Sequence, residues 1–109
     1  MVPERREEVI ARNEVLFREV NERVREVSVE ATSNPIDFLC ECGNGDCTET
    51  IPLTRSEYER VRSDPTLFVV KPGHGVPDLE HVVLEDERFQ VVRKHEEEAH
   101  IARETDPRR

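Results

Sequence analysis

The 109-residue sequence predicts an α+β fold in which a long N-terminal helix packs on a small, mostly antiparallel sheet and a short C-terminal helix follows. Three observations support this class. Apolar residues recur at helical spacing over 4–31, short β-rich runs separated by turns fill 36–94, and a charged helical pattern covers 95–104. Because this length fits one domain and no long linker interrupts it, we expect a single domain over 1–109.

The helix predicted over 4–31 begins with acidic residues, which are favourable in the first turn of a helix. At 100° per residue, its apolar side chains share an arc of roughly 120°. They are Val9, Ile10, Leu16, Phe17, Val20, Val24, Val27 and Ala31. The pairs Glu14–Arg18 and Glu19–Arg23, spaced i to i+4, are expected on the solvent-facing side of the helix.

Shorter elements are predicted after Pro35. Ile36, Phe38 and Cys40 recur at every second position, which predicts a strand over 36–40, and "TETIPL" predicts a second strand. "LTRSEYERVR" contains a capping box that opens a short helix, and "LFVVK" predicts a buried strand. "PGHGVP" predicts a rigid loop, "EHVVLEDERFQVVRK" a hairpin, and "HEEEAHIARE" a helix. We expect the final "TDPRR" to be frayed.

All three cysteines lie in one eight-residue stretch, "CECGNGDC", at positions Cys40, Cys42 and Cys47. Zinc takes thiolate and imidazole ligands at the corners of a tetrahedron, and ligands this close in sequence need a sharply folded backbone. Gly43 and Gly45 permit the positive-φ conformations that such a turn uses. The spacing predicts a zinc knuckle with one structural zinc per chain, which staples the segments within 36–94 together.

Three cysteines leave a closed zinc site one ligand short. We favour His74 as the fourth ligand, because it lies between two glycines in the loop that follows Pro72. His81 is the second choice, since an alternating strand could turn its side chain inward. Three alternatives to zinc stay open: unrelated buried thiols, a redox pair with a spare thiol, and an iron–sulfur cluster.

The stretch "CECGNGDC" resembles the zinc knuckle that follows the catalytic domain in histone-lysine methyltransferases of the SET type. This resemblance covers eight residues and implies only that the fourth ligand comes from elsewhere in the chain. Most of the chain resembles small uncharacterised bacterial proteins of the actinobacterial type. The motifs that carry this second resemblance are "RNE-x-LFREVNER", the C-x-C-x4-C knuckle, "PLT-x-x-EYE-x-VR", "PGH" and "DPR". It implies that the knuckle and the "PGH" motif belong to one site.

The composition argues against several classes of function. A net charge of −9, from 25 acidic and 16 basic residues, opposes direct binding of nucleic acid, which requires a basic surface. No apolar run is long enough for a membrane span, and the charged first ten residues lack a signal segment, so we expect a cytoplasmic protein. His95 and His100 are five residues apart, which is the wrong spacing for a zinc-protease helix. We expect no enzymatic activity.

The long helix is predicted to bind another chain. Six of its residues follow a 3-4 spacing typical of a coiled-coil seam: Ile10, Asn13, Phe17, Val20, Val24 and Val27. A protein partner or a homo-oligomer would dock there. The alternative is that this stripe packs on the protein's own sheet.

These expectations combine into one hypothesis and an alternative. The hypothesis is a small intracellular zinc-binding protein that acts as a protein–protein interaction or regulatory module. The alternative is a thiol-based redox sensor or redox enzyme, in which the cysteine cluster switches between metal-bound and oxidised states. A further idea is that the acidic surface mimics nucleic acid and occupies a basic cleft.

Overall fold

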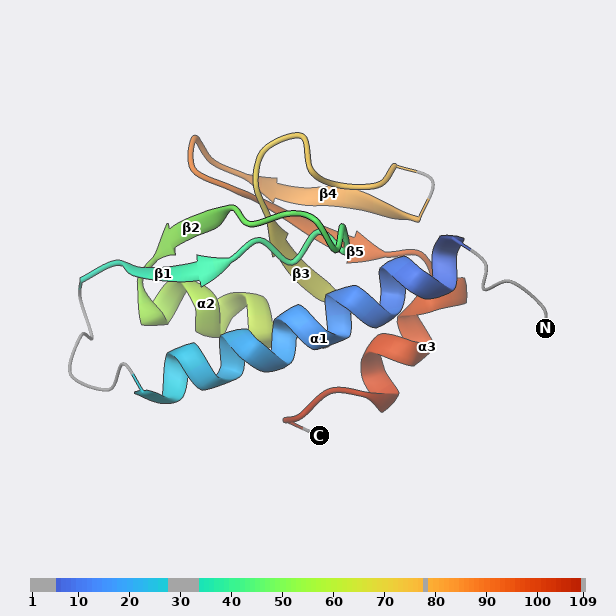
Figure 1. Ribbon diagram of the computed structural model, residues 1–109, viewed down its shortest axis with the longest axis horizontal. Coiled ribbons are helices and arrows are strands. Elements are labelled where there is room, and N and C mark those ends of the chain that lie inside the picture. Colours follow the sequence, from blue (N-terminus) through green and yellow to red (C-terminus); the bar gives the residue numbers. More distant parts are fainter. Residues whose placement is uncertain (1–5, 28–33, 78, 109) are drawn as a thin grey trace.

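The structure is a computed structural model that describes residues 6–27, 34–77 and 79–108. Along these residues the helices and strands follow one another as shown in Figure 1. They are α1 (Arg6–Val27), β1 (Ile36–Leu39), β2 (Thr50–Leu53), α2 (Arg55–Arg62), β3 (Leu67–Val70), β4 (Glu80–Glu85), β5 (Gln90–Lys94) and α3 (Glu96–Glu104). The fold is α+β, as predicted, although both ends of the helix predicted over 4–31 lie outside the described residues. Within the described ranges, none of the helices is long and apolar enough to cross a bilayer.

The strands form two small antiparallel sheets where the sequence predicted one. β1 and β2 pair with Phe38 opposite Ile51. In the other sheet the order is β3-β5-β4, with Val69 opposite Val91. The N–H of Glu41 donates to the carbonyl of Val69 at 2.8 Å, so the chain that leaves β1 runs along the outer edge of β3. This contact joins the cysteine-bearing segment to the three-stranded sheet.

The apolar core lies where α2 meets the two sheets. Phe38 of β1 stacks on Tyr58 of α2 with ring centroids 4.4 Å apart, and both are fully buried. The predicted capping box fixes the start of α2, since the Thr54 hydroxyl accepts from the N–H of Glu57 and the Glu57 carboxylate accepts from the N–H of Thr54. Further buried members of this core are Ile51, Leu53, Val61, Phe68, Val69, Val70, Phe89, Val91 and Val92.

Helix α1 buries a polar face, so the expectation that Glu14 and Arg18 face solvent is wrong. Both side chains are fully buried. The Arg18 guanidinium stacks on Phe68, 4.8 Å from the ring centroid, and donates to the carbonyls of Pro65 (2.7 Å) and Ala102 (2.9 Å). A buried guanidinium is tolerated there because carbonyl oxygens replace the water that it loses.

A buried lysine connects α1 to the three-stranded sheet. The ammonium group of Lys94 in β5 donates to Glu14 at 2.7 Å and to Glu80 at 3.0 Å. Burial raises the pKa of Glu14 well above its usual value, although Lys94 acts to lower it. With a proton on Glu14, the three side chains carry no net charge, and this lowers the cost of burying them.

The apolar side of α1 divides into two strips. Ile10, Phe17 and Val24 are half-buried, and Val24 packs against the core. The other strip faces solvent: the exposed fractions are 53% for Leu16, 40% for Val20 and 80% for Val27. At about 100° per residue, this exposed strip lies on the opposite side of the helix from Arg18.

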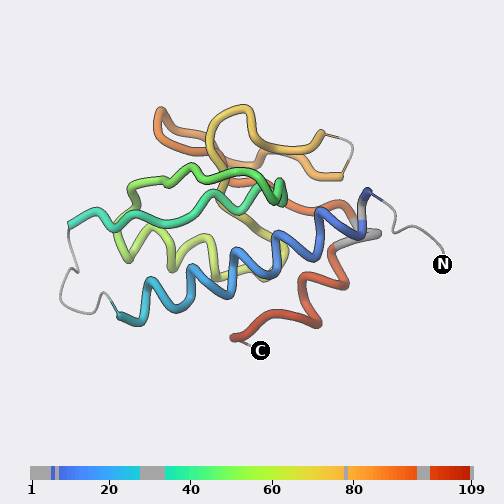
Figure 2. Tube along the Cα trace, viewed as in Figure 1, coloured from blue at the N-terminus to red at the C-terminus, as the bar shows by residue number. Residues whose placement is uncertain are grey.

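The chain after α3 is held by ion pairs, so the expectation of a frayed tail is wrong for the described residues up to 108. The side chain of Arg62 is fully buried and binds Glu22 of α1 and Asp106 of the tail. Arg108 donates to Glu22 at 2.9 Å and to Glu59 at 2.7 Å. We call these five residues the carboxylate–arginine cluster. It joins α1, α2 and the C-terminal tail, which Figure 2 shows returning below α1.

Candidate metal centre

The structure brings Cys40, Cys42, Cys47 and His74 together. One ligand atom from each residue, a thiol sulfur or an imidazole nitrogen, lies within 4.8 Å of the other three. The Nδ1 atom of His74 is 3.6 Å from the sulfur of Cys40 and 3.7 Å from the sulfur of Cys47. Cys40 and Cys42 are buried, whereas Cys47 and His74 are half-buried. We call these residues the thiol–imidazole cluster.

The spacing of the cluster fits a tetrahedral metal site. With metal–sulfur bonds of about 2.3 Å and a metal–nitrogen bond of about 2.05 Å, tetrahedral zinc separates sulfur from nitrogen by about 3.6 Å and sulfur from sulfur by about 3.8 Å. The two sulfur–nitrogen distances agree with the first value, and the upper limit of 4.8 Å on the separations within the cluster exceeds both values by about 1 Å. Three thiolates and one imidazole are a donor set that suits a closed structural zinc site. The cluster could therefore hold a metal ion.

The turn between Cys42 and Cys47 is held against α1. Gly43 has a φ of 79°, in the left-handed region that favours glycine. A Cβ atom at this position would lie 2.6 Å from Cγ2 of Ile10, so a larger residue does not fit. The side-chain amide of Asn13 donates to the carbonyl of Gly43 at 2.8 Å. Asn13 is one of the six residues predicted to contact another chain, and it also holds the cysteine turn against α1.

His74 is carried by a tight turn in the "PGH" motif. The N–H of His74 donates to the carbonyl of Lys71 at 2.9 Å, with Pro72 and Gly73 between them. Proline at the second position and a glycine with a φ of 83° at the third are the residues that a type II turn requires. The side chain of Gln90 accepts a hydrogen bond from the N–H of Gly73 at 3.2 Å, which ties the turn to β5. The imidazole is thus presented by a restrained segment.

Hydrogen bonds surround the sulfur atoms. The N–H of Lys71 donates to the sulfur of Cys40 at 3.2 Å. The hydrogen bond from Cys40 lowers the pKa of the Cys42 thiol to about 4, and the N–H of Asn44 acts in the same direction. The hydrogen bond with Cys42 raises the pKa of Cys40, and burial raises that of Cys47. Neighbouring thiolates repel one another, so a divalent cation among them would favour the deprotonated state of all three.

Glu41 supports the site from its inner side, a role that the sequence analysis missed. It is fully buried. Its carboxylate accepts hydrogen bonds from the side chains of Asn21 (2.8 Å) and Tyr58 (3.1 Å) and from the N–H of Val69 (3.0 Å). The amide of Asn21 also bonds to both the N–H and the carbonyl of Leu39. Side chains alternate along an extended segment, so Glu41 points to one face, where it is held by hydrogen bonds. Cys40 and Cys42, its neighbours in the sequence, point to the opposite face and reach the cluster.

His81, the second choice for the fourth ligand, has a different environment. It is exposed on β4, and its ring stacks on that of His95 with centroids 5.6 Å apart. Among the described residues, the four-ligand group includes His74 and neither of these two histidines. The geometry therefore favours His74 as the fourth ligand.

The six residues predicted as an interface do not share one environment. Ile10, Asn13, Phe17 and Val24 are half-buried, whereas Val20 and Val27 are exposed. A contact with another chain at these residues stays a prediction.

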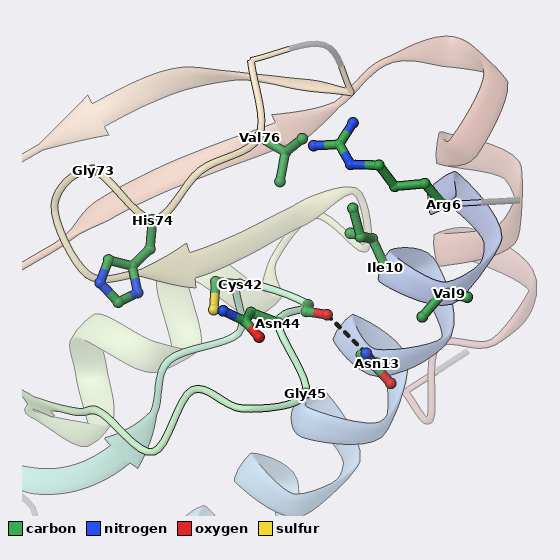
Figure 3. Close-up of a pocket in the computed structure, with 11 residues that line it drawn as sticks. Arg6, Val9, Ile10, Asn13, Cys42, Asn44, Gly45, Gly73, His74 and Val76 are labelled. Atoms are coloured by element: carbon green, nitrogen blue, oxygen red, sulfur yellow. Dashed lines mark hydrogen bonds between the residues drawn. The ribbon is translucent and has the colours of Figure 1, made fainter.

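A cleft of about 670 Å³ borders the cluster. Figure 3 shows Arg6 and Val9 of α1 on one side of this cleft and His74 and Val76 on the other, with Asn44 of the cysteine turn between them. Its lining mixes apolar and polar groups. The cluster therefore lies beside an open surface depression.

Comparison with known proteins identifies no relative: no family model, no curated protein and no solved structure matches the chain. The fold and the geometry of the cluster are therefore the basis on which a function is proposed.

Proposed function

We propose that this chain is a small zinc-binding interaction module, in which one zinc ion, bound by the thiol–imidazole cluster, has a structural role. The observation that carries the proposal is the convergence of four zinc-type ligands from two segments, with Cys47 and His74 separated by 27 positions. The ion would tie the turn that carries His74 to the turn that carries the cysteines.

The completeness of the ligand set supports a structural role. Four protein ligands fill a tetrahedron and leave no position for the water or substrate that a catalytic zinc needs. The surroundings of the ligands support the same role, since the N–H of Lys71 donates to a sulfur and Glu41 is held by three donors. A small core gains stability from such a metal, because binding free energy is added to folding free energy.

The outer side of α1 supports the interaction role. A helix on the surface of a globular protein usually turns its apolar side inward and its charged side outward. Here the buried side contains Glu14 and Arg18, while Leu16, Val20 and Val27 are exposed. Exposed apolar residues arranged along one strip support the proposal of a contact surface for another protein.

The metal content of purified protein tests the proposal. Mass spectrometry under native conditions should find one zinc per chain in the wild type and a clear loss in His74→Ala. His81→Ala is the matched control, because it removes a histidine outside the cluster and should keep the zinc. A wild type without zinc, or a His74→Ala variant with unchanged zinc affinity, would contradict the proposal.

The same sample distinguishes the redox alternative. Mild peroxide treatment should leave the zinc of a structural site in place until the protein unfolds. Release of zinc from the folded protein in step with disulfide formation among Cys40, Cys42 and Cys47 would instead support a thiol switch.

A further inference from the structure

The exposed strip of α1 has the residue spacing of a two-helix seam. Six residues lie on the side of α1 opposite Arg18, and we call them the α1 seam: Val9 and Asn13, which are half-buried, and Leu16, Val20, Arg23 and Val27, which are exposed. Their spacing alternates between four and three residues, which is the heptad pattern of helices that pack side by side. This strip differs from the predicted one, because Ile10, Phe17 and Val24 lie nearer to the buried side of the helix, where Arg18 points.

The seam is long enough for specific pairing and carries little charge. From Val9 to Val27 it extends about 27 Å along the helix. It contains no acidic residue, although the whole chain has a net charge of −9. Its one charged residue, Arg23, is exposed and has no ion pair among the described residues. Exposed Glu19 and Glu26 border the seam on one side. Within the seam itself a second copy meets no carboxylate, and Arg23 would attract the acidic surface of that copy.

Antiparallel pairing of two copies matches every seam residue to a suitable neighbour. If position i of one helix lies opposite position 36 − i of the other, then Val9 faces Val27 of the second copy and Leu16 faces Val20 of the second copy. Asn13 then faces Arg23 of the second copy. The amide N–H group of Asn13 is used on the carbonyl of Gly43, which leaves its side-chain oxygen to accept from that arginine.

Parallel pairing of the same seam is less favourable. It would place Arg23 against Arg23 of the second copy, and like charges brought together at a helix interface are destabilising. Antiparallel pairing gives four wholly apolar layers and two layers that each pair an amide with a guanidinium. A two-fold axis near position 18 generates all of these contacts, as expected for a symmetric dimer.

We propose that the α1 seam binds a second copy of this chain as an antiparallel helix pair, with Leu16 and Val20 at its centre. The inference rests on the proposed function and names the partner of its interaction surface. Each copy would keep its own thiol–imidazole cluster, because Cys40, Cys42, Cys47 and His74 lie within one chain.

Sedimentation equilibrium of the zinc-loaded protein tests whether the seam holds a dimer. The wild type should be a dimer at micromolar concentration, and Leu16→Asp should weaken the dimer at least about 100-fold, since the change occurs at two central positions. Leu84→Asp is a matched control: Leu84 lies on β4 and is 56% exposed, against 53% for Leu16. This control should remain a dimer, and both variants should keep their zinc and their helical circular dichroism signal.

A charge-pair experiment tests the antiparallel arrangement. Val27→Lys alone should weaken the dimer, and the double variant Val9→Glu/Val27→Lys should restore it, because antiparallel pairing joins the new glutamate to the new lysine of the second copy. The two positions lie about 27 Å apart in one helix, so they cannot pair within a chain. A double variant weaker than Val27→Lys alone would overturn the antiparallel arrangement.

Three further outcomes would overturn the dimer itself. The wild type could stay monomeric at high micromolar concentration, it could bind only a different protein through the seam, or Leu16→Asp could leave the dimer unchanged. Any of these results with one zinc per chain leaves the proposed zinc module standing, whereas absence of zinc contradicts that module whatever the oligomeric state.

Discussion

The thiol–imidazole cluster and the carboxylate–arginine cluster both join segments that are far apart in the sequence, but they do so with different chemistry. The first connects the cysteine turn to the turn that carries His74. The second connects α1, α2 and the tail through Arg62, Arg108 and three carboxylates. The thiols and the imidazole need an added cation to bind one another firmly, whereas the carboxylates and guanidiniums already have opposite charges. We therefore expect the stability of this fold to depend on a bound metal in one region and on its own side chains in the other.

Metal removal should have the largest effect and should act on one region only. A strong zinc chelator is expected to lower the thermal unfolding midpoint by at least about 10 °C, because zinc affinity contributes to folding free energy. Hydrogen exchange should then increase at 40–47 and 71–76 but stay slow at 58–62. Equal acceleration in both regions would show that the two clusters do not act independently.

Arg62→Met should have the largest effect in the other region. The substitution leaves Glu22 and Asp106 without the buried cation that they share, and removing one member of a buried ion pair costs about 3–5 kcal/mol. Urea unfolding of the zinc-loaded protein measures this loss. Zinc content should stay at one per chain, and a loss of zinc in this variant would show that the two clusters depend on each other.

Glu41→Gln tests how far polar contacts stabilise the cysteine segment without the metal. Glutamine replaces one acceptor oxygen with an NH2 group that faces existing donors, so we expect a loss of about 1–3 kcal/mol in unfolding free energy. Glu49→Gln is the control, since Glu49 is exposed and should change stability by less than about 0.5 kcal/mol. A negligible effect of Glu41→Gln would assign the stability of this segment to the metal alone.

Acid should weaken the carboxylate–arginine cluster. Burial raises the pKa of Asp106, but the N–H of Arg108 and the guanidinium of Arg62 outweigh it, and the pKa is lower than usual. A lowered pKa in the folded state adds stability above the unfolded pKa of about 4, and this stability is lost as pH falls through the folded pKa. Asp106→Asn should therefore be less stable than wild type at pH 7, and the difference should shrink towards pH 3. Comparing the two proteins at each pH cancels the effect of acid on the metal ligands, and a constant difference would contradict the prediction.

Arg93→Met should have the smallest effect. Arg93 pairs with Asp64 at 3.2 Å, but the two side chains are 47% and 37% exposed, so the pair contributes about 0–1 kcal/mol. Urea unfolding should barely distinguish this variant from the wild type. A loss as large as that of Arg62→Met would show that burial does not explain the difference between the two ion pairs.

Sequence reasoning succeeded where a residue type is rare or a local rule is strong. The cysteines were informative because three of them fall in eight positions, and His74 was informative because glycines flank it. The capping box at Thr54 and the alternation at Ile36 and Phe38 gave the bounds of short elements, because they depend on neighbours in the sequence. These features account for the fold class and for the ligands that the structure brings together.

The buried polar groups could not be predicted in the same way. Glu14, Arg18, Asn21 and Glu41 belong to residue types that are usually exposed, and their partners lie far along the chain. Glu14 and Arg18 also have the spacing of a solvent-exposed helical pair, which made the wrong assignment look correct. The acidic residue between two cysteines was the one available signal for Glu41, because an alternating segment turns it away from the ligands.

The polar underside of α1 limits how this helix can dock. A purely apolar stripe can slide by one turn, about 5.4 Å, and still find apolar contacts. The same slide here would separate Glu14 from Lys94 and Asn21 from the backbone of Leu39, and each orphaned group would cost about 1–3 kcal/mol. A misaligned α1 therefore loses several buried hydrogen bonds at once, so the helix has a single favourable docking position during folding.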